Sequence, residues 1–547
     1  MVRAVGAVPE RGQRQVPGTS TVLVTVLVAL WPLLLTLLLT WPLVSGTGYP
    51  LARDLVFVPD QPLTRASLGL GDVAPRAVPL DAVVSLLSLV ADGAVWARVL
   101  VPGALVAAGW GMQRCLAGAH PLAQLAASGV AVWNPWTVER LALGQWALLA
   151  GFAGSIWLVA GLLRWRDRRS RSDVVVVLVA AAVASLTPTG GLFALAVALV
   201  LLVGRPLRDQ WPLAVVAVLQ APWVLAGFLG PAARTSDPDG VAAFAARADG
   251  TGSAVLSLLG LGGIWDSTAT PGSRETPWVW LAVLWVLGTL AATWWWQRRD
   301  RRAGGENSRP ATEFLPPVGV VVLAVAGTVL AALSVLPGGE ALLRAVVTHV
   351  PGGGLLRDAQ KFLAPLVLLV AWSTGWLLER VRHSRLWDPV LWSPVLLVPL
   401  LVLPDATGSA WPTVRPVTYP SAFDEVGEQV AGDPDCRMLT LPLRSYRGFS
   451  WGSGRSSSDP ASRWFDCEVV VDDRLVVGES VIAGESALVA QLVADRDAGR
   501  SWARVAADAG IGWVLVYEDD PEAADLDLTG LTPVLRAKEM SLYRVRT

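Results

Sequence analysis

The chain has few charged residues, which make up 16% of its 547 residues. Lysine is almost absent, with Lys361 and Lys538 the only two, and the three histidines, His120, His349 and His383, are far apart. A histidine metal cluster or a histidine-based triad is therefore not expected. Basic and acidic residues nearly cancel, at a formal net charge of −1. The chain has no general positive excess for nucleic-acid binding.

Several sequence motifs of soluble enzymes are also missing. The chain contains no GxGxxG after a strand, no GxxxxGK[ST], no HExxH and no CxxC. These motifs would indicate a dinucleotide, nucleotide, zinc or thiol-redox site. Any chemistry is therefore expected from carboxylates, arginines, lysine and the lipid interface.

Apolar residues are abundant, at 53% of the chain. Their uninterrupted runs approach the roughly 20 residues that cross a membrane as a helix, and they lack the alternation of barrel strands. The first run is too long for a signal peptide, and no small-residue cleavage site ends it. We predict an all-α polytopic membrane bundle of about eleven transmembrane helices. They are expected near 21–45, 97–115, 120–133, 141–163, 174–188, 190–204, 211–230, 277–297, 315–336, 362–380 and 388–404.

The basic residues predict the orientation of this bundle, because short cytoplasmic loops collect arginine. They concentrate in alternate loops, while the opposite loops, 46–96, 133–140, 231–276 and 337–361, hold fewer. We predict a cytoplasmic tail at 1–20 and a membrane domain at 21–404 whose long first outer loop is 46–96. The cytoplasmic basic residues are Arg3, Arg11, Arg14, Arg114, Arg164, Arg166, Arg168, Arg169, Arg171, Arg205, Arg208, the QRRDRR cluster from Gln297, Arg309, Arg380, Arg382 and Arg385.

The composition changes after the last apolar run, and 405–547 is predicted to be an extracytoplasmic soluble α/β domain. Its β-like runs are RMLTLPL, EVVVDDRLVV and WVLVY, and its helical runs are SALVAQLVADRDAG and SWARVAADAG. Cys436 and Cys467 both lie in this domain. Outside the cell they are free to form a disulfide, with two unpaired buried thiols as the alternative.

The first outer loop begins with LARDLVFVPDQP, Leu51 to Pro62. Asp54 lies only a few residues beyond the first span, where an ionised group is less hydrated. Pairing with Arg53 or capping a turn would account for it equally well. Further along, the segment between Pro79 and Gly93 has an apolar face at helical spacing and is predicted to lie along the membrane surface.

A second outer stretch is VPGGGLLRDAQKFLAPLVLL, Val350 to Leu369. Arg357 and Lys361 stand four apart, which predicts that they share one face of a helix entering the membrane. Two cations there suit a lipid-linked phosphate or pyrophosphate, and a rare lysine offers a compact point charge. An interfacial pair that only extends toward water is the alternative.

A third stretch is VWNPWTVERLALGQWALL, Val132 to Leu149. Its tryptophans fit an aromatic belt at the membrane interface, and Glu139 and Arg140 stand at the outer start of the next span. A belt and a salt bridge alone would explain this pattern.

Together these stretches resemble the GT-C superfamily of integral-membrane glycosyltransferases. The matching features over 20–404 are the acidic residue after the first span, the long first loop, NPW…ERL…GQW and RDAQKF. They are most similar to actinobacterial arabinofuranosyltransferase-like and mannosyltransferase-like membrane proteins. The resemblance implies a polyprenyl-phosphate sugar donor, a glycan or lipid acceptor, Asp54 as general base, and Arg357 and Lys361 as donor-phosphate ligands. The residues expected to line the cavity are Arg53, Arg76, Asp81, Glu139, Arg140 and Asp358.

Some choices stay open at this point. Asp60, Asp72 and Asp81 are rivals of Asp54, and scattered carboxylates leave a divalent metal ion undecided. The segment SYRGFSWGSGR offers groups for stacking on an acceptor glycan. A non-catalytic transporter or flippase, or a scaffold for lipid-linked envelope intermediates, is the alternative function. The lack of an internal repeat favours the enzyme over the transporter.

Overall fold

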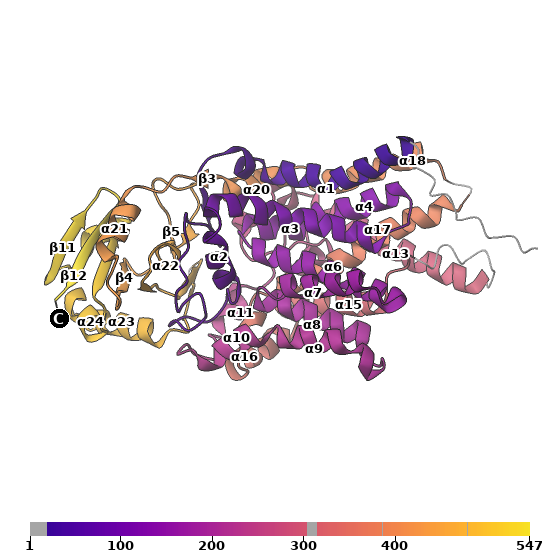
Figure 1. Cartoon of the computed structure of the whole chain (residues 1–547). Helices are drawn as coiled ribbons and strands as arrows, with labels where there is room; N and C mark the ends of the chain where they lie inside the picture. Colours follow the sequence, from indigo (N-terminus) through magenta and orange to yellow (C-terminus); the bar gives the residue numbers. More distant parts are fainter. Residues whose placement is uncertain (1–18, 304–313, 385–386, 479, 547) are drawn as a thin grey trace, which may run out of the picture.

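The computed structural model describes residues 19–303, 314–384, 387–478 and 480–546 (Figure 1). Nearly all of the predicted cytoplasmic tail lies outside these residues, as do Arg309 and Arg385. A mostly helical part forms one end of an elongated molecule, and a part containing strands forms the other.

Within the described residues, six helical segments are long and apolar enough to cross a membrane. A bent pair, Pro389–Val402 with Ala406–Val414, would make a seventh. The six are α1 (Thr19–Ser45), α3 (Gly93–Cys115), α6 (Trp146–Arg168), α9 with α10 (Trp211–Val218, Ala221–Leu229), α13 (Val279–Ala303), and the 3₁₀ helix η6 with α17 (Ala359–Leu363, Ala364–Arg382).

The predicted count of about eleven spans is not confirmed. Every predicted interval contains helix, but four of the helices have 12 to 16 residues. At 1.5 Å per residue they reach only about 18–24 Å, less than the roughly 30 Å hydrocarbon core. These shorter helices are α4 (Pro121–Val132), α7 (Arg171–Ala184), α8 (Pro188–Leu202) and α15 (Val318–Leu333).

Helix α6 lies at the centre of the bundle and packs against α3, α7 and α8. Small residues allow the closest approach. A Cβ at Gly154 would lie 2.7 Å from the Ala184 nitrogen of α7, and one at Gly151 would lie 2.9 Å from Gly190 of α8. Only glycine permits such backbone contact between membrane helices.

The segments on the strand-bearing end of the bundle carry the residues of interest. They include α2 (Leu80–Ser88), the predicted surface helix, which buries Leu80 and Val84 and leaves Leu86 exposed. The other helices there are α5 (Pro135–Ala142), α11 (Asp239–Ala243), α12 (Ala254–Leu259), α16 (Gly339–His349) and the 3₁₀ helix η5 (Gly353–Leu356).

The prediction that Arg357 and Lys361 share one face of a helix is wrong. The chain forms two short 3₁₀ helices, η5 and η6, with a break at Arg357 and Asp358, and α17 begins only at Ala364. Asp358 has non-helical angles, φ −89° and ψ 78°, and its side chain binds Arg140 instead. Side-chain attraction from another helix therefore overrides the local helical spacing.

The C-terminal part is built on a five-stranded sheet of order β11-β12-β10-β4-β7. Strands β7, β4 and β10 are parallel, and β12 and β11 continue antiparallel. The predicted run EVVVDDRLVV divides into β7 and β8, and β8 forms a separate hairpin with β9. The strands are β4 (Arg437–Leu441), β7 (Glu468–Val470), β8 (Leu475–Val477), β9 (Ser480–Ile482), β10 (Trp513–Tyr517), β11 (Leu531–Arg536) and β12 (Met540–Val545).

The two faces of this sheet have different partners. Leu439 and Val514 face a core with the two predicted helices, α23 (Ala487–Asp497) and α24 (Trp502–Asp508). Met438 and Leu515 face the opposite core with α21 (Ala422–Val430). This alternation of neighbouring residues is what the period of a strand requires.

The first outer loop belongs to the second of these cores. Its strands β1 (Tyr49–Ala52) and β2 (Leu55–Val56) form a small sheet with β3 (Pro416–Val417) in the order β2-β1-β3. Leu51, Val56 and Val58 are buried in the same cluster as Phe423 of α21. The loop that carries Asp54 is thus built into the C-terminal domain.

The predicted boundary at 404/405 precedes one more helix of the bundle. Helix α20 (Ala406–Val414) packs against α1 and α5, and the Thr413 hydroxyl donates to the Ala142 carbonyl at 2.7 Å. The sheet domain follows only after β3.

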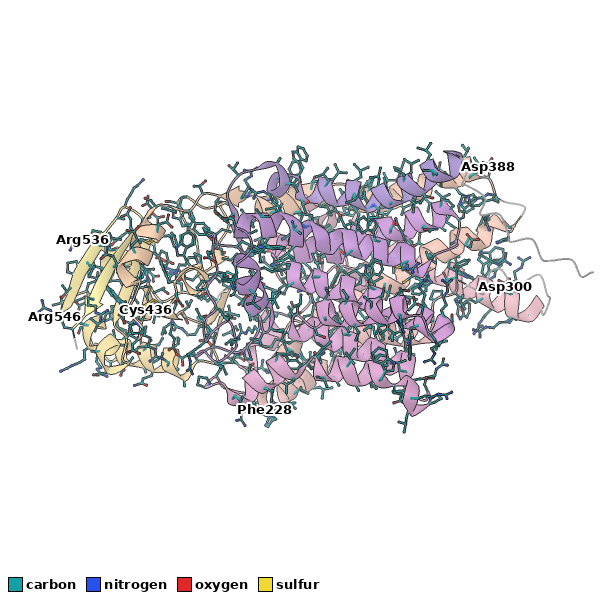
Figure 2. All side chains as sticks on the ribbon, in the orientation of Figure 1. Phe228, Asp300, Asp388, Cys436, Arg536 and Arg546 are labelled. Carbon is teal, nitrogen blue, oxygen red and sulfur yellow. A yellow bond between two sulfur atoms is a disulfide. The ribbon has the colours of Figure 1, made fainter. Side chains whose placement is uncertain are left out.

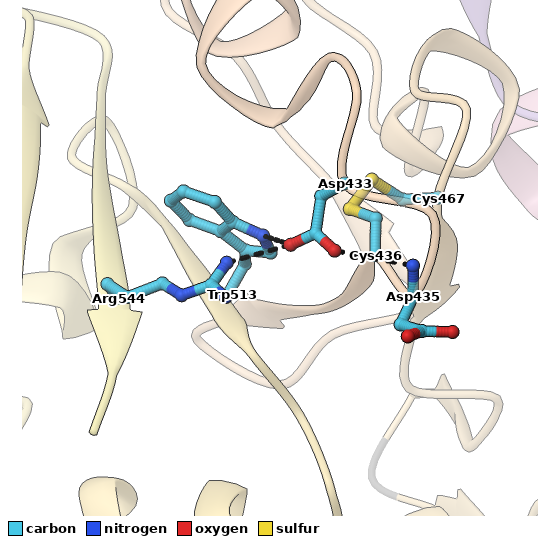
Figure 3. Close-up of a disulfide and its surroundings, with 6 residues drawn as sticks. All are labelled: Asp433, Asp435, Cys436, Cys467, Trp513 and Arg544. Atoms are coloured by element: carbon cyan, nitrogen blue, oxygen red, sulfur yellow. Dashed lines mark hydrogen bonds and ion pairs between the residues drawn. A yellow bond between two sulfur atoms is a disulfide. The ribbon is translucent and has the colours of Figure 1, made fainter. Parts of the chain in front are cut away.

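Cys436 and Cys467 form a disulfide, with 4.8 Å between their Cα atoms (Figure 3). It links the start of β4 to the start of β7. Nearby, Asp433 accepts hydrogen bonds from Trp513 at 2.9 Å and Arg544 at 2.8 Å. These contacts fasten the turn before β4 to β10 and β12.

The charged ends of the membrane helices lie opposite the sheet. Figure 2 shows Asp300 and Asp388 at one end of the molecule and Cys436 and Arg536 at the other. Asp300 lies within the basic last turns of α13 and pairs with Arg380 of α17 at 2.6 Å.

Candidate active site

Asp54 lies between β1 and β2, at the joint of the two parts of the molecule. The preceding residue, Arg53, has a φ of 56°, which turns the chain sharply. Its backbone bonds to Ser456 at 2.8 Å and Ser458 at 2.9 Å, in the C-terminal domain. The Asp54 nitrogen donates to the Leu143 carbonyl at 3.2 Å, in the turn between α5 and α6. Both sides of Asp54 are therefore fixed.

The Asp54 carboxylate accepts hydrogen bonds from two neutral side chains. The Tyr446 hydroxyl donates to Oδ1, and Gln145 Nε2 donates to Oδ2 at 3.2 Å. Gly144 makes the second contact possible, because at its φ of 75° a Cβ would come within 2.4 Å of the Leu55 nitrogen. The α5–α6 turn can thus approach the Asp54 loop closely.

Arg53 does not pair with Asp54. Its Nη2 lies 3.1 Å from Asp266 Oδ2 and also donates to Thr268, both in the 231–276 loop. The local Arg53–Asp54 salt bridge, which the sequence left open, does not form between these two described residues.

Arg140 links Asp54 to the RDAQKF segment. Its Nη1 donates to Gln145 Oε1 at 2.9 Å, and Gln145 in turn donates to Asp54. The same guanidinium binds Asp358 through both of its end nitrogens, at 2.9 Å for the Nη2–Oδ1 bond, and also donates to Gln360. A continuous chain of hydrogen bonds therefore runs from Asp54 to Asp358.

The hydrogen-bond chain also contains an ion pair, between Asp358 and Arg140. Burial alone would raise the pKa of Asp358, but the adjacent Arg140 guanidinium holds this pKa below its usual value. Asp358 therefore stays ionised beside Arg140, whose side chain is fully buried. Such a two-bonded arginine–carboxylate pair has a fixed orientation.

Glu139, next to Arg140, faces a second buried cluster. It accepts from Gln360 Nε2 at 3.1 Å and lies 3.5 Å from Arg274, which pairs with Asp249 at 2.8 Å. Burial and the nearby Asp249 raise the pKa of Glu139 well above its usual value, although Arg274, Arg140 and Arg247 act in the opposite direction. Through Glu139, this cluster holds the Gln360 side chain in place.

Lys361 differs from its charged neighbours. Within the part of the chain that the structure describes, its ammonium forms no hydrogen bond or ion pair, and it lies 5.6 Å from the centroid of the Phe362 ring. The nearby Asp358 is already bound by Arg140. Among the described residues, the half-buried ammonium of Lys361 therefore has no ion-pair partner of its own.

Arg357, by contrast, forms an ion pair. Its Nη2 lies 3.3 Å from Glu485 Oε1 of the C-terminal domain, and Arg76 binds the other oxygen of Glu485. Ser236 also donates to Glu485, at 2.8 Å. Burial and the positive charge of Arg76 lower the pKa of Arg357. The two predicted phosphate ligands thus have different surroundings.

The rival carboxylates of the first loop have other partners. Asp72 pairs with Arg437 at 2.8 Å, and Asp81 lies 3.4 Å from Arg463, both in the C-terminal domain. Asp60 is exposed. Asp54 is thus the one of these four that joins the Arg140 chain.

The described residues contain no cluster of side chains suited to bind a divalent ion. No group of three or more histidine, cysteine, aspartate or glutamate side chains there is arranged to hold a metal. Asp54 and Asp358 are joined only through Gln145 and Arg140.

Several residues of the site were not singled out from the sequence. Gln145 and Gln360 stood inside the quoted motifs GQW and RDAQKF, but neither has a charge to draw attention. Tyr446 stood in SYRGFSWGSGR, which was assigned to the acceptor, and Glu485 had no signal at all. Contacts between positions hundreds of residues apart leave no local pattern.

Of the comparisons with known proteins, the one with solved structures gives matches. No protein-family model and no curated protein matches the chain. Among solved structures, it is similar to the arabinofuranosyltransferase AftD from Mycobacteria, with a TM-score of 0.55 and 16% identity, over 95% of this chain and 40% of that one. A mutant of AftD, in its class 2 structure, gives a TM-score of 0.52 and 18% identity, over 95% and 41%.

At these identities the similarity concerns the fold alone. The chain shares its overall fold with AftD, in agreement with the predicted helical bundle and the strand-containing C-terminal domain. The chain spans about 40% of the length of the AftD structure that it matches.

Proposed function

We propose that this protein is a glycosyltransferase that moves a sugar from a polyprenyl-phosphate donor to a cell-envelope glycan or lipid acceptor at the outer face of the membrane. One observation carries the proposal. Asp54, Gln145, Arg140 and Asp358 form one connected framework, and the unpaired ammonium of Lys361 stands three residues beyond Asp358. The predicted base is thus connected to Asp358, which also accepts a backbone hydrogen bond from Lys361, in a fold similar to that of AftD.

In this reaction Asp54 removes the proton from the acceptor hydroxyl. A carboxylate offers about four lone-pair positions. Tyr446 and Gln145 each take one, so positions remain for the hydroxyl proton. The oxygen attacks the anomeric carbon of the donor sugar as the bond from that carbon to the phosphate oxygen breaks. The polyprenyl phosphate leaves with the bonding electrons, and Asp54 holds the proton.

Lys361 stabilises the charge that develops on the departing phosphate. A fixed cation at this point acts most strongly in the transition state. Arg357 has Glu485 beside it, so we assign it a secondary role on the donor side, together with Arg76. Arg53, Asp81, Glu139, Arg140 and Asp358 then support the walls of the site through their ion pairs.

The distribution of charge supports an outer location. The basic last turns of α13 and α17 lie at the end of the bundle opposite Cys436 and the sheet (Figure 2). Basic ends favour the cytoplasmic side, so the opposite end, with Asp54, would face outward. A lipid-linked donor would reach this end from the membrane.

The test is transfer by purified protein supplied with polyprenyl-phospho-arabinose or polyprenyl-phospho-mannose, with and without EDTA. We expect Asp54→Asn to lower transfer by about 10²- to 10⁴-fold, the usual contribution of general-base catalysis. The matched control is Asp60→Asn, an exposed carboxylate of the same loop, which should transfer like the parent. The two donors decide between arabinose and mannose. Loss of transfer on adding EDTA would establish a divalent ion.

Two outcomes would contradict the proposal. Equal transfer by Asp54→Asn and the parent would remove Asp54 from its role. Absence of transfer by the parent with either donor would favour the alternative, a transporter, flippase or scaffold for lipid-linked intermediates.

A further inference from the structure

We propose that Tyr446, a residue of the C-terminal domain, is a positioning residue for Asp54, so that the transferase site is complete only when this domain is docked. The inference rests on the proposed function, because it concerns how the base of that reaction is held. It assigns to the C-terminal domain a part in catalysis besides any binding of the acceptor.

Tyr446 and Gln145 reach Asp54 from two different parts of the chain. The tyrosine hydroxyl donates to Oδ1 from the C-terminal domain, and the glutamine amide donates to Oδ2 from the start of α6. One donor on each oxygen fixes the plane of the carboxylate as well as its position. Without Tyr446, rotation about the Asp54 side chain would be opposed by a single bond of 3.2 Å.

The backbone that carries Tyr446 is itself held firmly. Tyr446 and Arg447 form β5, which pairs with β6 (Ser457–Ser458), and β6 bonds in turn to Arg53. The neighbouring Arg447 is buried and donates to Asp459 at 2.8 Å. The hairpin is thus tied both to the sheet domain and to the residue next to Asp54.

Asp459 extends this attachment into the sheet. It also accepts from the Tyr517 hydroxyl of β10 at 2.6 Å. A chain of contacts therefore runs from the five-stranded sheet through the hairpin to Asp54. Such rigid support is what a general base needs to stay in productive geometry.

Tyr446 is suited to donate and not to exchange its own proton. Burial, and then the negative charge of Asp54, raise the pKa of Tyr446 well above its usual value, while Arg76 and Arg53 act in the opposite direction. The phenol therefore stays protonated at neutral pH. Its hydroxyl therefore serves as a hydrogen-bond donor that orients the Asp54 carboxylate.

The experiment compares kcat and KM for the parent and Tyr446→Phe, using the full chain and the donor established above. The phenylalanine keeps the ring and removes only the hydroxyl. We expect kcat to fall about tenfold to a hundredfold, in line with one lost hydrogen bond to a charged group. The KM values for donor and acceptor should stay like those of the parent, because Tyr446 acts through Asp54.

Tyr49→Phe is the matched control. It also removes a hydroxyl that donates to a carboxylate, that of Asp92 at 2.7 Å, but this carboxylate lies outside the hydrogen-bond chain of Asp54. It should leave kcat like that of the parent. An equal fall of kcat in both variants would overturn the inference, since the fall would then report general loosening.

Asp54→Asn separates this inference from the proposed function. If Asp54→Asn is inactive and Tyr446→Phe keeps the kcat of the parent, the inference fails and the function stands. If Asp54→Asn transfers normally, the function and the inference fail together. In the double variant, Tyr446→Phe should add almost no further loss, because the tyrosine acts through Asp54.

Discussion

Two carboxylates at the joint of the molecule, Asp54 and Glu485, are held in opposite ways. Asp54 accepts hydrogen bonds from neutral donors, Tyr446 and Gln145. Glu485 lies between two arginines, Arg76 and Arg357, and is almost fully buried. Arginines bind both carboxylate oxygens of Glu485, whereas both oxygens of Asp54 accept hydrogen bonds from uncharged side chains. The Glu485 region therefore fastens the two parts, and the Asp54 region is available for chemistry.

The two donor-side cations show the same difference. Arg357 has its carboxylate in Glu485, while the Lys361 ammonium has no partner in the described residues. The four-residue spacing of Arg357 and Lys361 in the sequence could not show which of the two cations is paired. Their partners come from other elements, and these partners decide which charge is still available.

The largest expected effect tests whether a buried ion pair stabilises the fold. Arg274→Met should lower the free energy of unfolding by about 3–5 kcal/mol, because it leaves Asp249 buried without its cation. Chemical or thermal unfolding in detergent measures this. Arg247→Met, which breaks a partly exposed pair with Glu275, is the control and should cost less than about 1 kcal/mol. Equal effects of the two would contradict the distinction.

The next prediction sets Lys361 against Arg357. Lys361→Gln should lower donor transfer about a hundredfold, as loss of one transition-state donor does, with unfolding unchanged. Arg357→Gln should lower the free energy of unfolding by about 1–3 kcal/mol, because Glu485 then keeps only Arg76 and Ser236. Transfer rates and melting temperatures of both variants check this. A loss of stability in Lys361→Gln as large as that in Arg357→Gln would remove the difference between them.

The smallest effect concerns the attachment of the C-terminal domain. Glu485→Gln keeps the shape of the side chain and removes its charge, which leaves two arginines facing each other. We expect about 1–2 kcal/mol of destabilisation and faster limited proteolysis around 472–486. The control, Glu522→Gln, breaks an exposed pair with Arg444 and should change proteolysis little. Unchanged proteolysis in Glu485→Gln would show that the ion pair does not hold the domain.

The sequence predicted the elements better than it predicted the contacts. The runs RMLTLPL and WVLVY are strands, and SALVAQLVADRDAG contains a helix, because alternation and helical periodicity are local properties. The helical face shared by Arg357 and Lys361 was wrong, since Asp358 is drawn toward Arg140 of α5. The number of spans is not confirmed, because several of the predicted intervals contain apolar helices shorter than a membrane crossing requires.

The sequence alone determined that this is a helical membrane protein with a strand-containing C-terminal part, since both follow from hydrophobic patterning. It also placed Asp54, Arg140 and Lys361 in conspicuous segments. Only the tertiary structure decided that Tyr446 reaches Asp54 and that Glu485 occupies Arg357. A hydrogen bond or ion pair forms between side chains that are close in space, and when the partners are distant in the chain the residues around each reveal nothing of the other.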